Sequence, residues 1–574
     1  MKSSDSTPRV VLLTLAVIVG VIALGFVPQF ELFGMPIRSV DLLSDLRDGA
    51  ADEPVEYEAD IERLEQELAS MVVRDTVAVV DSLPVLPPVR YEWIESEVRA
   101  ETRAQLRSEV LRDVAESRSV AIENFDTLPV TRFDNLVEKL ASGEDVRIAF
   151  MGDSFVEGDI LTSDMRDELQ RLFGGRGVGF VACDIPFKTV RRTVKRSSSG
   201  WSAYSVMKPK SVPQEVADKF FISGYLARGG AGATTTWSAT DAFPTLDSCT
   251  RARVLLYSRD TSTVELRLND SIPHSIEIAG DDRLRELYVE AQNIGSLGIK
   301  VTGGQILCYG VSLEGDSGVV VDNFSVRSNN GHAIFGTGAA VNRQADDMLG
   351  YDLVVLQYGL NIMQKGQRGY SNYRKQLCNM IAYAERCFPD AAILVLGVSD
   401  RWVKNEEMGG YESIGSADAL TSYQRAAADS TNVMFWNTYE AMRALGGMPQ
   451  FVANGWAAGD HTHINFAGGR RIAKALVAAI VEPVYELIKG REDEERRLEE
   501  RRQRMLEAQR RQQMQLELSL EATRDLLEGV DLAGVDSLGE GDAVDAGADA
   551  VTIDDLGSGQ AAEEEVALNI EAEE

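Results

Sequence analysis

The chain has 574 residues, a formal net charge of −32 at pH 7 and an apolar content of 44%. This length predicts more than one domain with a large buried core, and the acidic balance argues against nucleic acid or anionic lipid as the main partner. The five cysteines show no CxxC pair and no zinc-ligand spacing, so neither a metal site nor a disulfide framework is expected.

An uncharged apolar run at residues 10–27 is the first feature of the chain. It is long enough to span a bilayer, and it lies between Lys2 and Arg9 on one side and Glu31 on the other. The flanking charges predict a cytoplasmic N-terminus, with the remaining chain outside the cytoplasm. A cleaved signal peptide is the alternative, because Ala23-Leu24-Gly25 has the small-x-small pattern of a cleavage site. The apolar run continues past these residues, which favours an uncleaved transmembrane anchor.

Residues 31–130, which follow the anchor segment 1–30, are charged and mostly helical in pattern. An apolar helical seam precedes the helix-breaking stretch 83–88, and the helical pattern resumes at residues 93–118. The seam comprises Ile61, Leu64, Leu68 and Met71. Two interpretations fit this segment: a helical stalk that lifts the next domain off the membrane, and a helical cap packed on that domain. Of the two, a helical stalk over residues 31–130 is the prediction.

Alternating helices and buried strands predict an α/β domain in two parts, residues 131–214 and 323–488. The first part opens with an amphipathic helix at residues 132–141 and a buried strand at residues 146–151. The second part contains three more strands and three helices. The strands begin at Asp352, Ala391 and Asn432, and the helices cover residues 371–386, 420–428 and 466–488. This alternation predicts a parallel sheet with both faces covered.

Residues 215–322 interrupt the α/β pattern with many short runs of alternating apolar and polar side chains. The run VELRLND, which begins at Val264, is one of them, and Gly, Asn and Asp turns separate the runs. The segment therefore predicts an inserted all-β domain, either a sandwich or a jelly roll.

The C-terminal part of the chain changes composition twice. Residues 489–528 are dense in Arg and Glu with a thin apolar seam, which favours a solvated single helix over a coiled coil. Residues 529–574 are rich in Gly, Ala and acidic side chains and predict a disordered tail. No Lys or Arg follows Arg524, and about half of the net charge lies beyond it. A protein partner for this helix and tail remains an open alternative.

The stretch RIAFMGDSFVEGD at residues 147–159 places Gly-Asp-Ser at the end of the first strand. One interpretation is a serine N-cap at a strand-to-helix turn, and the other is a nucleophile, Ser154, at the mouth of an α/β sheet. Serine is a weak nucleophile until a histidine accepts its proton, and a carboxylate then fixes the histidine tautomer. The chain contains four histidines, namely His274, His332, His461 and His463.

The loop GDHTHINFAGG at residues 459–469 supplies a carboxylate and a base together. Asp460 precedes His463 by three residues, so one loop presents Asp460 to Nδ1 and leaves Nε2 free to reach Ser154. His461 lies too close to Asp460 for an easy side-chain bond and is expected to be an exposed neighbour.

With these motifs the chain resembles the SGNH (GDSL) hydrolase family. That family carries a Gly-Asp-Ser block, an oxyanion glycine, a Gly-x-Asn block and a terminal Asp-x-x-His. The blocks occur here in the same order, as Gly152-Asp153-Ser154, Gly359-Leu360-Asn361 and Asp460-His461-Thr462-His463. The resemblance implies a flavodoxin-like three-layer sandwich and a catalytic triad of Ser154, His463 and Asp460. It implies no metal and no organic cofactor.

A narrower resemblance, to the peptidoglycan O-acetylesterase branch, rests on GDSFVEGDILTSDMRDELQRLFGGRGVGFV and on the β-rich insert that follows it. In that branch the oxyanion glycine follows the insert in an Asn-Gly-Ala-like turn. The corresponding stretch here is Asn330-Gly331-His332-Ala333. The resemblance therefore implies Gly331, rather than the earlier Gly200, beside the N–H of Ser154 and the side-chain amide of Asn361 in the oxyanion hole.

These observations predict a membrane-anchored serine esterase that removes O-acetyl groups from a glycan, with acetylated peptidoglycan as the expected substrate. The apolar run at residues 10–27 and its flanking charges predict a single-pass protein of a bacterial inner membrane, with its catalytic domain in the periplasm or outside the cell. Two alternatives stay open. One is an O-acetyltransferase acting on a cell-envelope polysaccharide, because the same triad can pass an acyl group to a sugar hydroxyl. The other is a glycan-binding envelope protein without activity.

Overall fold

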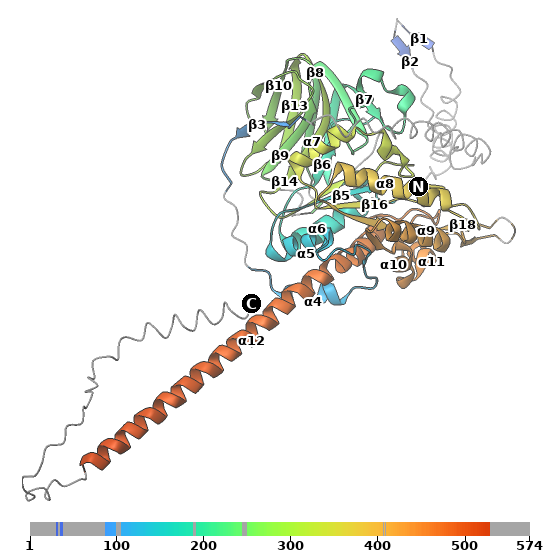
Figure 1. The fold of residues 1–574 in the computed structure, drawn as a ribbon. Helices are drawn as coiled ribbons and strands as arrows, with labels where there is room; N and C mark the ends of the chain where they lie inside the picture. The colour runs from blue at the N-terminus through green and yellow to red at the C-terminus, as the bar shows by residue number, and fades with distance from the viewer. Residues whose placement is uncertain are drawn as a thin grey trace, which may run out of the picture. The chain divides into compact units, whose positions relative to one another are not determined.

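The computed structural model describes most of the chain between residues 86 and 528. The described residues are 30–32, 35–37, 86–98, 105–187, 191–240, 242–243, 249–405, 407 and 409–528. The chain divides into two compact units, Met1–Asp493 and Glu494–Glu574. The first unit contains the α/β fold and the β-rich insert (Figure 1).

A six-stranded, mostly parallel sheet forms the centre of the first unit. Its spatial order is β15 (Val319–Asn323), β5 (Val146–Gly152), β16 (Leu353–Gln357), β17 (Ala392–Leu396), β20 (Met434–Trp436) and β4 (Glu123–Asn124). The first five strands are parallel, and β4 runs antiparallel to β20. In chain order these five strands read 2-1-3-4-5 across the sheet, which is the flavodoxin-like arrangement. The predicted α/β class with a parallel sheet is confirmed.

Amphipathic helices cover this sheet, since its central strands β5, β16 and β17 are buried along their whole length. Figure 1 shows α8 on one side of β5 and β16, and α5 and α6 on the other. The helices are α5 (Arg132–Ser142), α6 (Thr162–Phe173), α7 (Ala339–Leu349), α8 (Ser371–Cys387), α9 (Ala417–Ser430), α10 (Thr438–Ala444), α11 (Gly447–Ala453) and α12 (Phe466–Glu528). A capping box between Thr131 and Asp134 starts α5 directly before β5.

The β-rich insert is an antiparallel sheet that encloses a hydrophobic core of its own around Trp237. Its strands are β6 (Gly179–Ala182), β7 (Val194–Ser205), β8 (Tyr225–Ala239), β9 (Arg251–Tyr257), β10 (Ser262–Leu268), β11 (His274–Ile278), β12 (Leu284–Glu290), β13 (Ser296–Gly303) and β14 (Gln305–Glu314). The sheet thus begins before residue 215, where the sequence predicted its start. Strand β15, predicted to close the insert, belongs instead to the central sheet beside β5. Its apolar run suits a buried parallel strand, and alternation alone does not separate the two cases.

Strand β3 (Val89–Ile94) corrects the helical pattern predicted around Trp93. It pairs in parallel with β12 at one end of the insert sheet, and its side chains alternate between half-buried and exposed. The Trp93 ring stacks on His274 of β11 with centroids 4.9 Å apart, and the N–H of Ala279 donates to the Tyr91 hydroxyl at 3.1 Å. Strands β11 and β3, which stand at the two ends of the sheet order, are therefore in contact, and β3 is part of the insert sheet.

Residues 105–130 pack on the α/β fold, as in the cap interpretation, and do not form a free stalk. Helix α4 (Ser108–Glu116) buries Leu111 completely, and the Ser108 hydroxyl donates to Glu492 of α12 at 2.5 Å. The Trp436 indole N–H donates to the carbonyl of Val120 at 3.3 Å. Near the N-terminus, β1 (Phe30–Leu32) and β2 (Met35–Ile37) form an antiparallel pair. The apolar seam predicted at residues 61–71 lies outside the described residues.

Helix α12 joins two predicted helices, residues 466–488 and 489–528, into one continuous helix. In the second unit, Leu498 and Met505 are 55% and 57% exposed, so the structure gives no support for a coiled coil. Within the described part of the chain, no helix combines the length and apolarity that a membrane span requires. The apolar run at residues 10–27 and the acidic tail at 529–574 lie outside the described residues.

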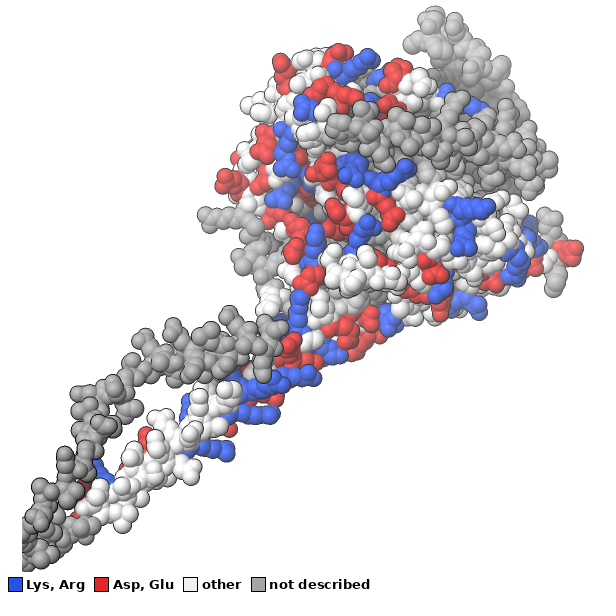
Figure 2. All heavy atoms as spheres, viewed as in Figure 1, with Lys and Arg blue, Asp and Glu red and all other residues white. Residues whose placement is uncertain are grey.

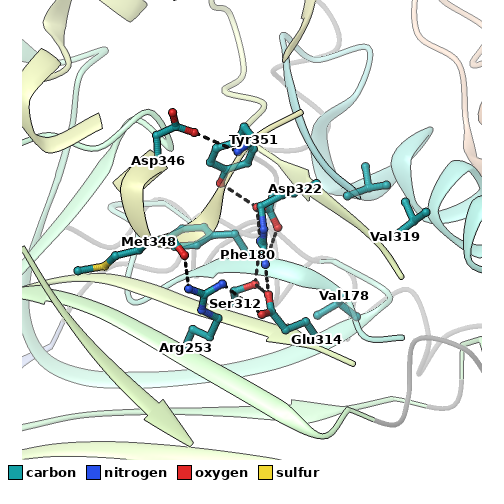
Figure 3. Close-up of polar contacts among 12 residues, drawn as sticks. Val178, Phe180, Arg253, Ser312, Glu314, Val319, Asp322, Asp346, Met348 and Tyr351 are labelled. Carbon is teal, nitrogen blue, oxygen red and sulfur yellow. Dashed lines mark hydrogen bonds and ion pairs between the residues drawn. The ribbon is translucent and has the colours of Figure 1, made fainter. Parts of the chain in front are cut away.

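A buried network of ion pairs connects the insert to the central sheet (Figure 3). Arg147 of β5 pairs with Glu314 of β14 and, at 2.8 Å, with Asp322 of β15. Arg253 of β9 pairs with Glu286 of β12 and, at 3.5 Å, with Glu314. Burial alone lowers the pKa of Arg147, but the two carboxylates raise it overall, so the cation is retained. The network lies at the start of β5, the end opposite Ser154.

Candidate active site

Ser154 lies at the carboxyl end of β5, at the position where the strand order of the central sheet reverses. β5 has β15 on one side and β16 on the other, and Asn361 follows the end of β16. Ligands of open α/β sheets bind outside the carboxyl ends of the strands at such a switch point. The Ser154 side chain is mostly buried, with 7% of the residue exposed. The topology thus brings two of the predicted site residues to one edge.

The structure brings Ser154, His463 and Asp460 together in one hydrogen-bonded chain. The Ser154 Oγ lies 3.2 Å from Nε2 of His463, and Nδ1 of His463 lies 2.7 Å from Oδ2 of Asp460. The second oxygen of Asp460 accepts the backbone N–H groups of Thr462 and His463 at 2.9 and 3.0 Å. Partial burial raises the pKa of Asp460, but these hydrogen bonds outweigh it and lower the pKa overall. Asp460 is therefore a carboxylate that orients the His463 ring.

The Gly469 position explains how the His463 loop is held against the Ser154 loop. A Cβ at Gly469 would lie 1.9 Å from the carbonyl oxygen of Ile160, so only glycine permits this approach of α12. One residue later, Arg470 pairs with Asp164 of α6 at 2.7 Å. The start of α12 is therefore fixed to the segment that follows Ser154.

Asn361 contacts the Ser154 turn through Asp153. The Asn361 amide donates to Oδ2 of Asp153 at 3.4 Å and to the carbonyl of Asn329 at 3.1 Å. Asp153 is fully buried, and this burial raises its pKa to about 7 although the backbone N–H groups of Phe155 and Leu360 favour the ionised form. Asp153 thus connects the two turns that carry Ser154 and Asn361.

The predicted oxyanion role of Gly331 is not met in this conformation. Its backbone N–H donates to Oδ1 of Asn329 at 2.9 Å, within a local Asx turn. Gly331 has φ of 94°, and a Cβ there would lie 2.5 Å from the sulfur of Met380. Glycine is therefore required for backbone shape and packing. The alternative, Gly200, lies at a bulge of β7 in the insert, packed against Ala233.

Asn329 is a site residue that the sequence analysis missed. It is buried, with 4% of the residue exposed, and it accepts a hydrogen bond from each of two predicted oxyanion donors, Gly331 and Asn361. The only sequence signal was the pair of asparagines directly before Gly331. Because Asn and Asp commonly make Asx turns two residues ahead, this signal predicts the turn but not the contact with Asn361.

The remaining histidines do not enter the hydrogen-bonded chain of Ser154. His461, predicted to be exposed, is half-buried under the Tyr411 ring, with centroids 3.7 Å apart. His332 follows Gly331, and its Nδ1 lies 2.9 Å from the Gln376 amide of α8. His274 belongs to the insert sheet.

The insert also approaches the loop after Ser154. A cavity of about 70 Å³ lies between Glu157 and Gly158 of this loop and the insert residues Arg196 and Tyr225. In the described part of the chain, no group of three His, Cys, Asp or Glu side chains has the geometry to hold a metal ion. The groups that the structure brings together at the site are a serine hydroxyl, an imidazole and a carboxylate, with the Asn361 amide nearby.

No family model matches the sequence, and no curated protein matches it. Among solved structures, a peptidoglycan O-acetylesterase matches with a TM-score of 0.51 and 22% identity, over 64% of this chain and 99% of that one. A family two carbohydrate esterase from Cellvibrio japonicus matches with a TM-score of 0.16 and 11% identity, over 41% of this chain and 86% of that one. A family 6 carbohydrate-binding module matches with a TM-score of 0.16 and 8% identity, over 24% and 95%. The first likeness confirms the resemblance at the level of the fold.

Proposed function

We propose that this protein is a serine ester hydrolase that removes O-acetyl groups from a glycan, with acetylated peptidoglycan as its substrate. The observation that carries the proposal is the chain from Ser154 through His463 to Asp460 at the switch point of the sheet. Serine, imidazole and carboxylate in this order are the arrangement that acyl transfer to serine requires.

In the proposed reaction, Ser154 Oγ attacks the acetyl carbonyl while Nε2 of His463 accepts the serine proton. Asp460 holds the Nδ1–H and stabilises the imidazolium that forms. His463 then gives the proton to the departing sugar alkoxide. The sugar leaves as an alcohol, and the acetyl group remains as an ester on Ser154. Water attacks this ester, its proton passes to His463 and then to Ser154, and acetate is released.

The developing oxyanion needs hydrogen-bond donors close to Ser154, and each such donor contributes on the order of 10²–10³ in rate. The Ser154 N–H and the Asn361 amide are the donors we assign. The Asn361 amide donates to the Asn329 carbonyl in this structure. The oxyanion of a bound acetyl group must therefore compete with that carbonyl for the amide N–H. Gly331 becomes a third donor only if its N–H leaves Asn329.

The choice of a glycan rests on two features. The fold is shared with a peptidoglycan O-acetylesterase over nearly all of that chain. The insert lines a small cavity beside the loop after Ser154, so insert residues lie near the position that we propose for the substrate.

The deciding experiment measures acetate released from O-acetylated peptidoglycan by the full chain and by Ser154→Ala. The proposal expects release by the wild type and a loss of at least ~10³-fold in the variant. Equal release by the two proteins rejects the mechanism. Net transfer of acetyl groups to an added glycan acceptor, rather than to water, identifies a transferase. Glycan binding that Ser154→Ala leaves intact, with no hydrolysis of any acetyl ester, identifies a binding protein.

We further propose that residues 10–27 anchor the chain in a bacterial inner membrane with the catalytic domain outside the cytoplasm. The positive residues Lys2 and Arg9 before an uncharged apolar run support this orientation. Added protease should digest the α/β domain in spheroplasts, and high salt should not release the protein from membranes. Recovery of the full-length protein in the soluble fraction would contradict an uncleaved anchor.

A further inference from the structure

A hairpin next to the site contacts both loops that carry predicted catalytic groups. It consists of β18 (Trp402–Lys404) and β19 (Tyr411–Ser413), paired antiparallel. The sequence motifs do not include it, and the mechanism above does not use it. Its first strand follows Arg401, whose carbonyl accepts the N–H of Ile414 at 3.1 Å, so Arg401 lies at the base of the hairpin.

On one side, the hairpin holds the loop of Asp460 and His463. The N–H of Trp402 donates to the carbonyl of His461 at 3.0 Å, and the Tyr411 ring stacks on the His461 ring. His461 has φ of 55°, which a non-glycine residue adopts only when its surroundings impose it. The two contacts with the hairpin hold His461 in this bend, which lies between Asp460 and His463.

On the other side, the hairpin holds the turn of Asn361. The Arg401 guanidinium donates to the carbonyl of Leu360, the residue before Asn361, at 3.3 Å. The N–H of Gly366 donates to the carbonyl of Ile414 at 2.9 Å, and Lys365 pairs with Glu412. Arg401 and Trp402 are adjacent, so two consecutive residues connect the Asn361 turn to the His463 loop.

The environment of the Arg401 guanidinium differs from that expected for a side chain that only fills space. It is half-buried, and its Nε is buried without an acceptor among the described residues. None of the ion pairs found among the described residues includes Arg401. Burial lowers the pKa of Arg401, and the nearby charge of Asp460 opposes this effect. A half-buried cation without an ion pair is unfavourable, and an apolar side chain of similar length would pack there at lower cost. A positive charge beside the oxyanion turn, however, favours a developing negative charge.

We propose that Arg401 is a positioning residue of this site, which connects the Asn361 turn to the Asp460–His463 loop and places a positive charge beside both. The inference rests on the proposed function, because it concerns the same reaction. It predicts that the guanidinium acts on the chemical step more than on substrate binding, since Arg401 works through Leu360 and the His463 loop.

The test compares Arg401→Gln, Arg401→Lys and Arg401→Ala in the full chain, with p-nitrophenyl acetate as the probe. Arg401→Gln should lower kcat by about 10–100-fold and change KM by less than ~3-fold. Arg401→Lys keeps the charge and should recover at least a third of the wild-type kcat, although it lacks the planar fork of arginine. Guanidinium chloride at tens of millimolar should raise kcat of Arg401→Ala at least ~5-fold, and sodium chloride at the same ionic strength should not.

The matched control is Arg425→Gln. Arg425 is an exposed arginine of α9 that pairs with Glu123, so its loss should leave kcat and KM unchanged. A wild-type kcat in Arg401→Gln overturns the proposal. A loss of activity that neither lysine nor guanidinium restores, together with a lower melting temperature, also overturns it, because both results indicate a purely structural role.

A second readout separates this proposal from the proposed function. A fluorophosphonate probe labels an activated serine without requiring ester hydrolysis. If the wild type is labelled at Ser154 but cleaves no acetyl ester, the proposed substrate class is wrong, and the labelling rate of the Arg401 variants still tests the positioning role. If the wild type is not labelled at all, Ser154 is not activated and both proposals fail.

Discussion

At the scale of single residues, Asp153 is the group whose protonation state is expected to affect the stability of the site. Its carboxyl group is fully buried between the Ser154 turn and Asn361, and burial raises its pKa to about 7. When the pKa of a carboxyl group is higher in the folded state than in the unfolded state, the folded protein is more stable with that group protonated than with it ionised. Its contribution to stability is therefore fully present below about pH 4 and is lost as the pH rises through about 7.

Asp153→Asn should remove this dependence. The melting temperature of the variant relative to the wild type should rise between pH 4 and pH 7 and level off above pH 8, because asparagine does not ionise. Thermal unfolding across this pH range checks the sign. Parallel curves for the two proteins would show that Asp153 titrates normally. The variant should also lose about 10-fold in kcat, because the single oxygen of an asparagine side chain cannot accept both the Phe155 N–H and the Asn361 amide, as the two Asp153 oxygens do.

A second residue-scale prediction concerns Gly469. In Gly469→Ala the new Cβ meets the backbone carbonyl of Ile160 at 1.9 Å, which no side-chain rotation relieves. The start of α12 must shift, and the His463 loop with it, so we expect a lower melting temperature and a kcat reduced by at least ~10-fold. Gly490→Ala on the same helix is the control, because no atom lies within 4 Å of its Cβ. There alanine should stabilise the helix by up to about 1 kcal/mol. Equal behaviour of the two variants would contradict the close-approach argument.

Sequence motifs identified two kinds of site residue. Some have a partner close by in the chain, and others belong to motif blocks that follow one another in the order typical of the resembled family. Asp460 and His463 share a loop, and Ser154 follows a strand whose pattern is clear. Arg401 and Asn329 could not be identified in this way, because their importance depends on contacts with loops that are distant in sequence. The direction of the Gly331 N–H was also unpredictable, since the side chain of Asn329 decides it.

At the scale of secondary-structure elements, the clearest patterns gave the correct assignments. The strands β5, β16, β17 and β20 and the helices α5 and α8 lie where apolar periodicity predicted them. Strand β3 was misread because charged residues alternate with aromatic ones over only six positions, and its partner β12 lies far along the chain. Strand β15 was assigned to the insert because sequence does not show which sheet a short strand joins.

The role of β3 and α4 predicts where a soluble fragment can begin. A fragment of residues 86–528 retains both elements, a fragment of residues 105–528 loses β3, and a fragment of residues 132–528 loses both. The shortest fragment exposes the contact surfaces of β12 and of Trp436 and should melt at least ~10 °C below the longest, or precipitate. Thermal unfolding and size-exclusion chromatography of the three fragments test this order. Equal melting temperatures would show that β3 and α4 do not contribute to the stability of the folded unit.

At the scale of the whole folded unit, charged side chains lie both on the surface (Figure 2) and in the buried contact between the insert and the central sheet. On the face shown in Figure 2, acidic and basic side chains of the described residues are interspersed. The charges with the strongest structural effect are instead buried between the insert and the central sheet. Glu314 illustrates this point, since burial raises its pKa but Arg147 and Arg253 outweigh burial and keep it ionised.

Arg147→Met should therefore be strongly destabilising, because it leaves Glu314 and Asp322 buried without their main partner. Removal of one member of a buried ion pair typically costs about 3–5 kcal/mol of unfolding free energy. Arg425→Met, which breaks the exposed pair with Glu123, should cost less than about 1 kcal/mol. Chemical denaturation of both variants measures the difference. Similar losses would mean that water reaches the Arg147 network.

The position of β3 has a consequence for synthesis of the chain. Arg90 of β3 and its partner Glu286 are 196 residues apart in sequence. Ribosomes add about 5–20 residues per second, so β3 emerges roughly 10–40 s before β12 exists. During that time its backbone donors and acceptors have no partner, and an unpaired strand is prone to aggregate. The sequence VRYEWI interleaves Arg90 and Glu92 with apolar side chains. Charged side chains on an unpaired strand oppose edge-to-edge association, so we expect Arg90 and Glu92 to limit aggregation of β3 until β12 has been synthesised.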